Sequence, residues 1–186
     1  MNINPKSVFR RGAEDGAWFG LYLSVMFIFV AYSMTVPLLG HLATLMALGV
    51  PIYTFITLRK GFIDNGCFYT FSELWTYGIM LFACGSLIMA ATIILYISGI
   101  YPTFIYDQCQ IAIDAYKSIG GEMGNEIAST LEKAIELKQL PTPFELATNI
   151  LSFNVFSGSI LSIILAPIIR HYRPKGGRTQ NFTNQQ

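Results

Sequence analysis

One carboxylate stands at the edge of a long apolar run, where it could either serve chemistry or begin a helix. Glu73 follows Thr70 by three residues in the stretch TFSE, and an apolar segment comes directly after it. A carboxylate at a membrane face could act in catalysis or bind a ligand. The same spacing is that of a capping box, in which each side chain satisfies a backbone amide of the other residue. Because capping explains both residues together, we interpret Thr70 and Glu73 as a helix cap.

Three polar side chains inside apolar runs could line a path for a neutral solute. They are His41, Asn149 and Asn154. A proton relay through His41 would need an ionisable partner at the same depth, and the apolar run that holds His41 contains none. We therefore interpret His41 as a hydrogen-bonded packing residue and the two asparagines as part of the most polar intramembrane surface.

Small residues recur every four positions near the end of the chain, at Gly158, Ser162 and Ala166. This spacing lets a second helix approach closely, either from the same chain or from a partner. The sequence has no glycine-rich phosphate loop, no cluster with metal-ligand spacing and no nucleophile beside a base. It therefore predicts no cofactor and no metal, and it favours a non-enzymatic protein.

The elements that must position these residues are membrane spans. Only 12% of the 186 residues are charged, against about 25% in an ordinary soluble domain. No Asp, Glu, Lys or Arg occurs in 16–58, 74–106 or 146–169. About 20 apolar residues cross a bilayer core of about 30 Å, and Pro37 divides the first run into two. We predict an all-α membrane protein, a single integral membrane domain whose four transmembrane helices are at about 17–34, 38–58, 75–98 and 144–169.

The first run could also be a signal peptide, since basic residues precede it. It is longer than a usual signal-peptide core of about 7–15 residues, and Glu14 and Asp15 stand in front of it, so we favour a span.

The distribution of positive charge predicts the orientation of the spans. Nine of the 12 lysines and arginines fall on the side of the two termini and of the 59–73 loop. They are Lys6, Arg10, Arg11, Arg59, Lys60, Arg170, Arg173, Lys175 and Arg178. Positive charge stays on the cytoplasmic side near span ends. We therefore expect both termini in the cytoplasm, with a basic tail at 170–186, and a periplasmic segment at 99–143.

The segment at 99–143 is expected to form two helices separated by Gly120–Gly121. Apolar residues recur every four positions along the second helix, at Met123, Ile127, Leu131 and Ile135. Such a stripe packs either on the protein's own helices or on a partner. The acidic residues around it disfavour binding to anionic lipid.

Two stretches carry a resemblance to a known family. They are LRKGFIDNGCFYTFSELW at 58–75 and SGSILSIILAPIIR at 157–170. Together with the four-span layout they resemble a bacterial family of small membrane proteins known as domain of unknown function 4199. Thr70, Phe71 and Glu73 occupy the family's entry to the third span, whereas Cys67 stands where a second glycine is often seen. The resemblance implies the inner membrane of a bacterium with a periplasm, and it implies no activity.

Three functions remain open on these grounds. The leading hypothesis is a non-enzymatic accessory or assembly subunit of an envelope-related membrane complex, in contact with membrane lipid and with a membrane-protein partner or further copies of itself. Its contact surfaces would be two stripes of residues. The first, the Gly158 stripe, consists of Gly158, Ser162 and Ala166, and the second, the outer stripe, consists of Met123, Ile127, Leu131 and Ile135. The first alternative is an oligomeric channel or transporter for a small solute, and the second is a lipid-acting enzyme that uses Glu73, Asp64 or His41. The short basic tail is read as an orientation signal, so nucleic acid is not an expected partner.

Overall fold

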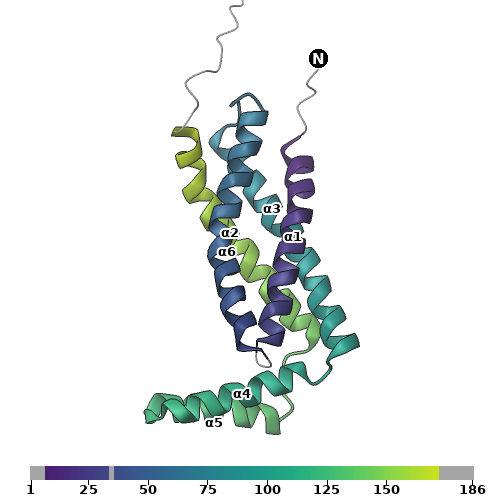
Figure 1. The fold of residues 1–186 in the computed structure, drawn as a ribbon, viewed down its shortest axis with the longest axis vertical. Coiled ribbons are helices and arrows are strands. Elements are labelled where there is room, and N and C mark those ends of the chain that lie inside the picture. Colours follow the sequence, from purple (N-terminus) through teal and green to yellow (C-terminus); the bar gives the residue numbers. More distant parts are fainter. Residues whose placement is uncertain (1–6, 34–35, 172–186) are drawn as a thin grey trace, which may run out of the picture. The chain divides into compact units, whose positions relative to one another are not determined.

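The computed structural model describes residues 7–33 and 36–171, and within these ranges every regular element is a helix. The order is shown in Figure 1: α1 (Val8–Tyr32), α2 (Pro37–Asp64), α3 (Phe71–Leu95), the π-helical turn η1 (Tyr96–Ile100), α4 (Phe104–Ile119), α5 (Gly121–Glu136) and α6 (Pro143–His171). Residues 172–186 of the predicted tail lie outside the described part of the chain.

Four of these helices are long and apolar enough to cross a membrane, which makes the chain a multi-pass membrane protein. They are Val8–Tyr32, Pro37–Asp64, Phe71–Ile100 and Pro143–His171. The helices extend beyond the predicted spans, since α1 begins nine residues earlier than residue 17 and α2 continues six residues past residue 58. The helices therefore include charged residues that we used as boundaries, among them Asp15 in α1 and Arg59 in α2.

Only 11% of the apolar window of α2 is buried within the chain. Its exposed surface consists of large aliphatic side chains, including Leu38, Leu45, Leu48, Ile52 and Ile56. A surface of this kind suits the acyl chains of a bilayer.

The chain forms two compact units, Met1–Ile88 with Phe153–Gln186, and Met89–Ser152. In the first unit, glycines let α1 lie close to α3. Gly12, Gly16 and Gly20 follow one another at four-residue spacing on the face of α1 that meets α3. A Cβ atom on Gly16 would lie 2.8 Å from the Cβ of Cys84, and one on Gly20 would lie 2.8 Å from the Gly85 carbonyl oxygen. No larger residue fits at these positions, so the backbones approach as in other small-residue helix pairs.

Small residues also join α3 to α6 in the first unit. A Cβ atom on Gly158 would lie 2.1 Å from Cγ of Phe82, and one on Gly78 would lie 1.9 Å from the Ser162 hydroxyl oxygen. The indole nitrogen of Trp75 donates a hydrogen bond of 3.1 Å to Ser159. A buried cluster closes this end of the unit, formed by Leu58, Phe62, Tyr69, Leu74, Tyr77, Ala166 and Ile169.

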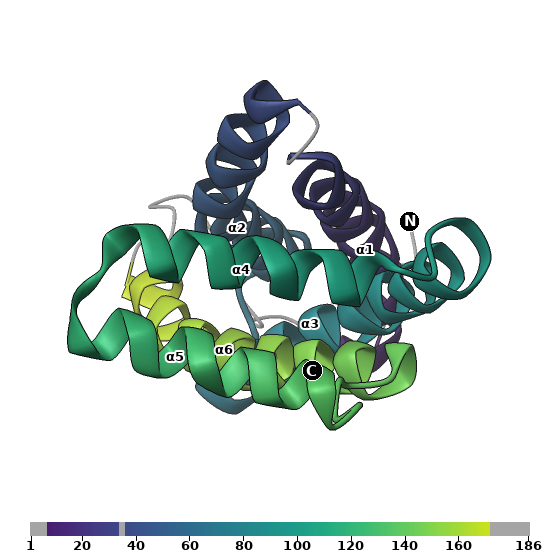
Figure 2. The same ribbon diagram turned by 90° about the horizontal axis from the view of Figure 1, so that it is seen from below.

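The second unit contains a hairpin of α4 and α5, which lie side by side in Figure 2. Gly120 and Gly121 reverse the chain with φ angles of +68° and +80°, a region that glycine adopts without strain. Gly124 packs against the Tyr116 carbonyl, from which an added Cβ would be 2.7 Å away. Lys117 forms a 2.5 Å ion pair with Glu132, and this hydrogen bond raises the pKa of Lys117. The hairpin is therefore held by its own contacts.

The residues of the predicted outer stripe differ in their exposure in this hairpin. Ile127, Leu131 and Ile135 are half-buried, whereas Met123 is 76% exposed. The residues of α5 that are fully buried are the small ones, Gly124 and Ala128. A small residue lets α4 come so close that the larger side chains pack around the contact rather than in it.

Candidate functional site

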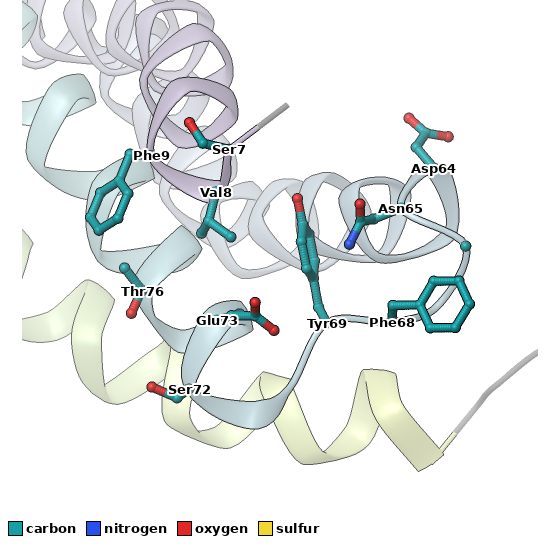
Figure 3. Close-up of a pocket in the computed structure, with 11 residues that line it drawn as sticks. Ser7, Val8, Phe9, Asp64, Asn65, Phe68, Tyr69, Ser72, Glu73 and Thr76 are labelled. Carbon is teal, nitrogen blue, oxygen red and sulfur yellow. The ribbon is translucent and has the colours of Figure 1, made fainter. Parts of the chain in front are cut away.

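The ends of three spans surround a cavity of about 750 Å³ in the first unit. The start of α1, the turn between α2 and α3 and the first turns of α3 supply its walls, as Figure 3 shows. Its lining consists of Ser7, Val8, Phe9, Asp64, Asn65, Gly66, Phe68, Tyr69, Ser72, Glu73 and Thr76. The cavity joins residues about 60 positions apart, so it depends on the packing of α1 against the α2–α3 pair.

The α2–α3 turn is made by two successive residues with positive φ. Gly66 has φ of 66° and Cys67 has φ of 64°. The Cys67 amide donates to the Phe62 carbonyl at 2.9 Å, which satisfies a carbonyl at the end of α2. Cys67 therefore adopts a left-handed conformation that glycine would adopt more readily, at a cost of about 1 kcal/mol.

Thr70 and Glu73 lie at the start of α3 in the reciprocal arrangement of a capping box. The Thr70 amide and hydroxyl both donate to Oε2 of Glu73, at 2.7 and 2.8 Å, and the Glu73 amide donates to the Thr70 hydroxyl at 3.3 Å. Oε1 of Glu73 has no hydrogen-bond partner among the described residues. One oxygen of Glu73 thus caps the helix, and the other remains available at the cavity wall.

A second capping box begins α6, and the sequence analysis missed it. The Thr142 amide donates to Oε2 of Glu145 at 2.8 Å, and the Glu145 amide donates to the Thr142 hydroxyl at 3.2 Å. The stretch TPFE has the same three-residue spacing as TFSE, so the signal was present in the sequence.

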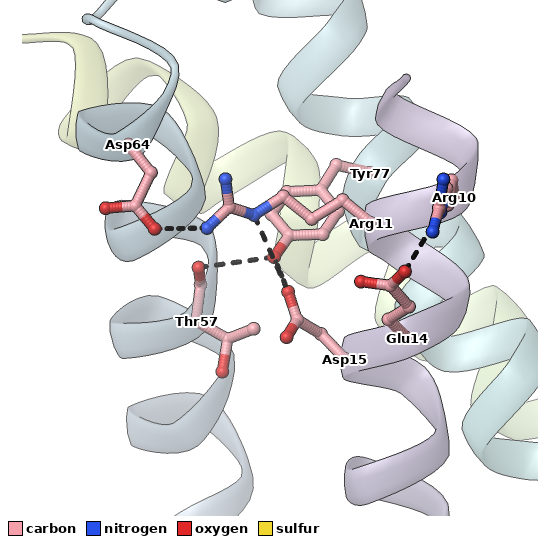
Figure 4. Close-up of polar contacts among 7 residues, drawn as sticks. All are labelled: Arg10, Arg11, Glu14, Asp15, Thr57, Asp64 and Tyr77. Atoms are coloured by element: carbon pink, nitrogen blue, oxygen red, sulfur yellow. Dashed lines mark hydrogen bonds and ion pairs between the residues drawn. The ribbon is translucent and has the colours of Figure 1, made fainter. Parts of the chain in front are cut away.

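Next to the cavity, a charged cluster joins three helices (Figure 4). Arg11 of α1 forms an ion pair with Asp64 of α2, and its Nε lies 3.8 Å from Oδ2 of Asp15. The hydroxyl of Tyr77 donates to Asp15 and lies 3.5 Å from the Thr57 carbonyl oxygen. Tyr77 is completely buried, and a Cβ on Gly61 would lie 2.5 Å from its ring. The cluster therefore fixes α1 and α2 around the aromatic side chain that α3 places between them.

This cluster shows that α1 contains ionisable residues that lie before the predicted first span at about 17–34. Arg11 and Asp15 lie within α1, with 19% and 37% of their side chains exposed. We had placed both before the first span because charge was used as its boundary. Their spacing of four residues could have revealed them, since it puts opposite charges on one helix face.

α3 of the same chain covers the Gly158 stripe, which favours its interpretation as a helix-packing face over a partner face. Ser162 and Ala166 are fully buried, and Gly158 faces the ring of Phe82. A stripe of small residues cannot distinguish a helix of its own chain from a helix of another.

The three polar residues proposed for a solute path line neither of the two cavities at the α2–α3 turn. Nδ1 of His41 lies 3.0 Å from the carbonyl oxygen of Pro37, and its side chain is exposed. Asn149 is exposed and Asn154 is half-buried on α6. By contrast, the structure does bring Asp64 and Glu73 to one cavity.

A second cavity of about 490 Å³ lies on the other side of the same turn. Phe68 and Tyr69 line both cavities, and the end of α6 supplies Pro167, Arg170 and His171 to the second one. The turn therefore separates a cavity with carboxylates from a cavity with basic side chains.

Comparison with known proteins gives a family and no established function. No curated protein and no solved structure matches the chain. Residues 14–171, which include both capping boxes and most of the lining of the cavity, match a family model. The chain belongs to the family described as "Protein of unknown function (DUF4199)".

Proposed function

We propose that the protein is a non-enzymatic accessory or assembly subunit of a bacterial inner-membrane complex. The observation that carries this proposal is the α4–α5 hairpin. It is held together by its own contacts, yet it keeps large apolar side chains at its surface. Ile119 and Met123, which flank the Gly120–Gly121 turn, are 75% and 76% exposed. An apolar patch rimmed by charge is typical of a protein-binding surface.

The charges around this patch indicate the kind of partner. Glu122 and Glu126 are exposed beside Met123, and the hairpin as a whole carries more acidic than basic residues. A membrane surface rich in anionic lipid would repel it. A partner protein with a basic rim around an apolar pocket would complement it.

The proposed orientation has both termini in the cytoplasm and the hairpin in the periplasm. The two cavities show that the start of α1, the α2–α3 turn and the end of α6 meet on one face of the first unit. Arg10, Arg11, Arg59, Lys60 and Arg170 belong to these span ends. Such a concentration of positive charge favours the cytoplasmic side.

Cysteine labelling will test this orientation in cells whose outer membrane has been made permeable. In a background with the three native cysteines replaced by serine, Ser118→Cys on the hairpin should react with a membrane-impermeant maleimide before lysis. Lys60→Cys on α2 should react only after lysis, because it lies on the cytoplasmic side. Both replaced residues are exposed, so their reactivity reports the compartment. Labelling in the reverse order would contradict the orientation.

Purification of the tagged protein in mild detergent will test the assembly function. We expect a second membrane protein at a fixed ratio, because the hairpin patch is apolar and exposed. The double change Ile119→Glu with Met123→Glu should remove that protein by placing charge in the contact. Asn125→Glu adds one charge at an exposed, polar position of α5 and should leave the complex intact. A pure homo-oligomer whose mass is unchanged by the double variant would contradict the proposal and favour an oligomeric channel.

A further inference from the structure

The composition of the 750 Å³ cavity suits a positively charged ligand. Asp64 and Glu73 line it, and no lysine or arginine among residues 7–33 and 36–171 does. Asp64 is already paired with Arg11, whereas Glu73 forms no ion pair within the described ranges of the chain. Since Oε2 of Glu73 accepts both bonds from Thr70, Oε1 is left to face a ligand. The wall formed by α3 therefore carries one solvent-exposed carboxylate that has no ion-pair partner in the part of the chain that the structure describes.

Aromatic side chains complete the surroundings of this carboxylate. Figure 3 shows Val8, Tyr69 and Glu73 directed into the space between α1 and the turn. Tyr69 is only 6% exposed, so its ring forms a fixed part of the wall, and Phe9 adds a second ring that is 60% exposed. A cation near an aromatic face gains about 0.5–2 kcal/mol from the quadrupole of the ring. A carboxylate can accept charge-assisted hydrogen bonds from a primary ammonium, and neighbouring rings add this attraction to them.

An anionic ligand fits this cavity less well, although the first residues of two helices line it. The Arg10 amide of α1 donates to the Ser7 hydroxyl at 3.4 Å, and the Glu73 amide donates to the Thr70 hydroxyl at 3.3 Å. These caps occupy amides that would otherwise attract an anion. The two carboxylates would also repel it.

We propose that this cavity binds a primary ammonium group, with Glu73 as its counter-ion and Tyr69 and Phe9 as its aromatic walls. The ammonium could belong to the headgroup of an ethanolamine lipid or to a soluble amine. The exposed ring of Phe9 lies at the end of a span, where aromatic residues meet lipid headgroups. Arg170 in the adjacent cavity has the charge that suits the phosphate of such a headgroup. This proposal is independent of the accessory function, since it concerns a different unit of the chain.

Native mass spectrometry of the full-length protein will test the proposal. The protein is purified with an equimolar mixture of phosphatidylethanolamine and phosphatidylglycerol, and the lipids that it retains are counted. Wild type should retain phosphatidylethanolamine in preference, and Glu73→Gln should weaken this retention about tenfold by removing a charge-assisted contact. Glutamine still serves in a capping box, so the helix start is preserved. Glu145→Gln makes the same change in the other capping box, outside the cavity, and should retain lipid like wild type.

A second arm separates the two sources of the ammonium group. Ethanolamine is added to protein in phosphatidylglycerol micelles, and the unfolding temperature is followed for the same three proteins. If ethanolamine raises the unfolding temperature of wild type but not of Glu73→Gln, and no lipid is retained selectively, the site binds a soluble amine. Selective lipid retention that needs Glu73 would assign it to a lipid. The ammonium proposal is overturned if Glu73→Gln behaves like wild type in both arms, or if wild type neither retains phosphatidylethanolamine in preference nor is stabilised by ethanolamine.

Discussion

Replacement of Gly158 by alanine is expected to destabilise the protein by about 1–3 kcal/mol, although it adds only one methyl group. The new Cβ would lie 2.1 to 2.5 Å from three ring carbons of Phe82, which is only 5% exposed. The movement of the ring is restricted, because Phe82 packs edge to face against Phe19 of α1 at a centroid distance of 4.9 Å. Thermal unfolding in detergent, followed with a thiol-reactive dye, measures the loss.

Two further variants show whether the contact itself causes this loss. Gly99→Ala is the matched control, since an added Cβ there meets nothing within 4 Å. It should change the free energy of unfolding by less than about 0.5 kcal/mol. Combining Gly158→Ala with Phe82→Leu should recover part of the lost stability, because leucine leaves room for the methyl group. If Gly158→Ala unfolds at the wild-type temperature but changes oligomeric mass, the stripe would be a partner surface after all.

The four spans could be predicted because each depends on a local property of the chain. A charge-free run long enough to cross a bilayer is visible without any tertiary information, and so is the proline that separates α1 from α2. Gly120 and Gly121 also gave the correct division between α4 and α5, since the turn needs two positive φ angles in succession. The family resemblance was correct for the same reason, because it followed these local features.

The candidate site could not be predicted, because it depends on which helices meet. Treating charge as a boundary placed the first span at residue 17, and this removed Gly12, Gly16 and Arg11 from consideration. Once α1 is known to begin at Val8, its glycines explain the close approach of α3. Glu73 was recognised as a cap, yet no local pattern shows that its second oxygen faces a cavity whose opposite wall is 60 residues earlier in the chain.

Replacement of Arg11 by methionine is expected to cost about 1–3 kcal/mol, whereas the same change at Arg10 should cost less than about 0.5 kcal/mol. Both arginines pair with an acidic residue four positions later on α1. The Arg10 pair is open to water, with 70% and 44% of the two side chains exposed, so solvent replaces it easily. Arg11 is 19% exposed and also bridges to Asp64 on α2. Its loss leaves the carboxylates of Asp15 and Asp64 without this shared cation, beside the buried Tyr77.

The cause of this loss can be separated from packing, because methionine keeps most of the volume of the arginine stem. Adding Asp15→Asn and Asp64→Asn to Arg11→Met should restore much of the stability, since no lone charge then remains in the cluster. A triple variant as unstable as Arg11→Met alone would show that the arginine acts through shape rather than charge. Because Asp64 also lines the cavity, Arg11→Met should loosen the wall that faces Glu73. Retention of phosphatidylethanolamine should therefore fall in Arg11→Met and remain at the wild-type level in Arg10→Met, which links the charged cluster to the ammonium site.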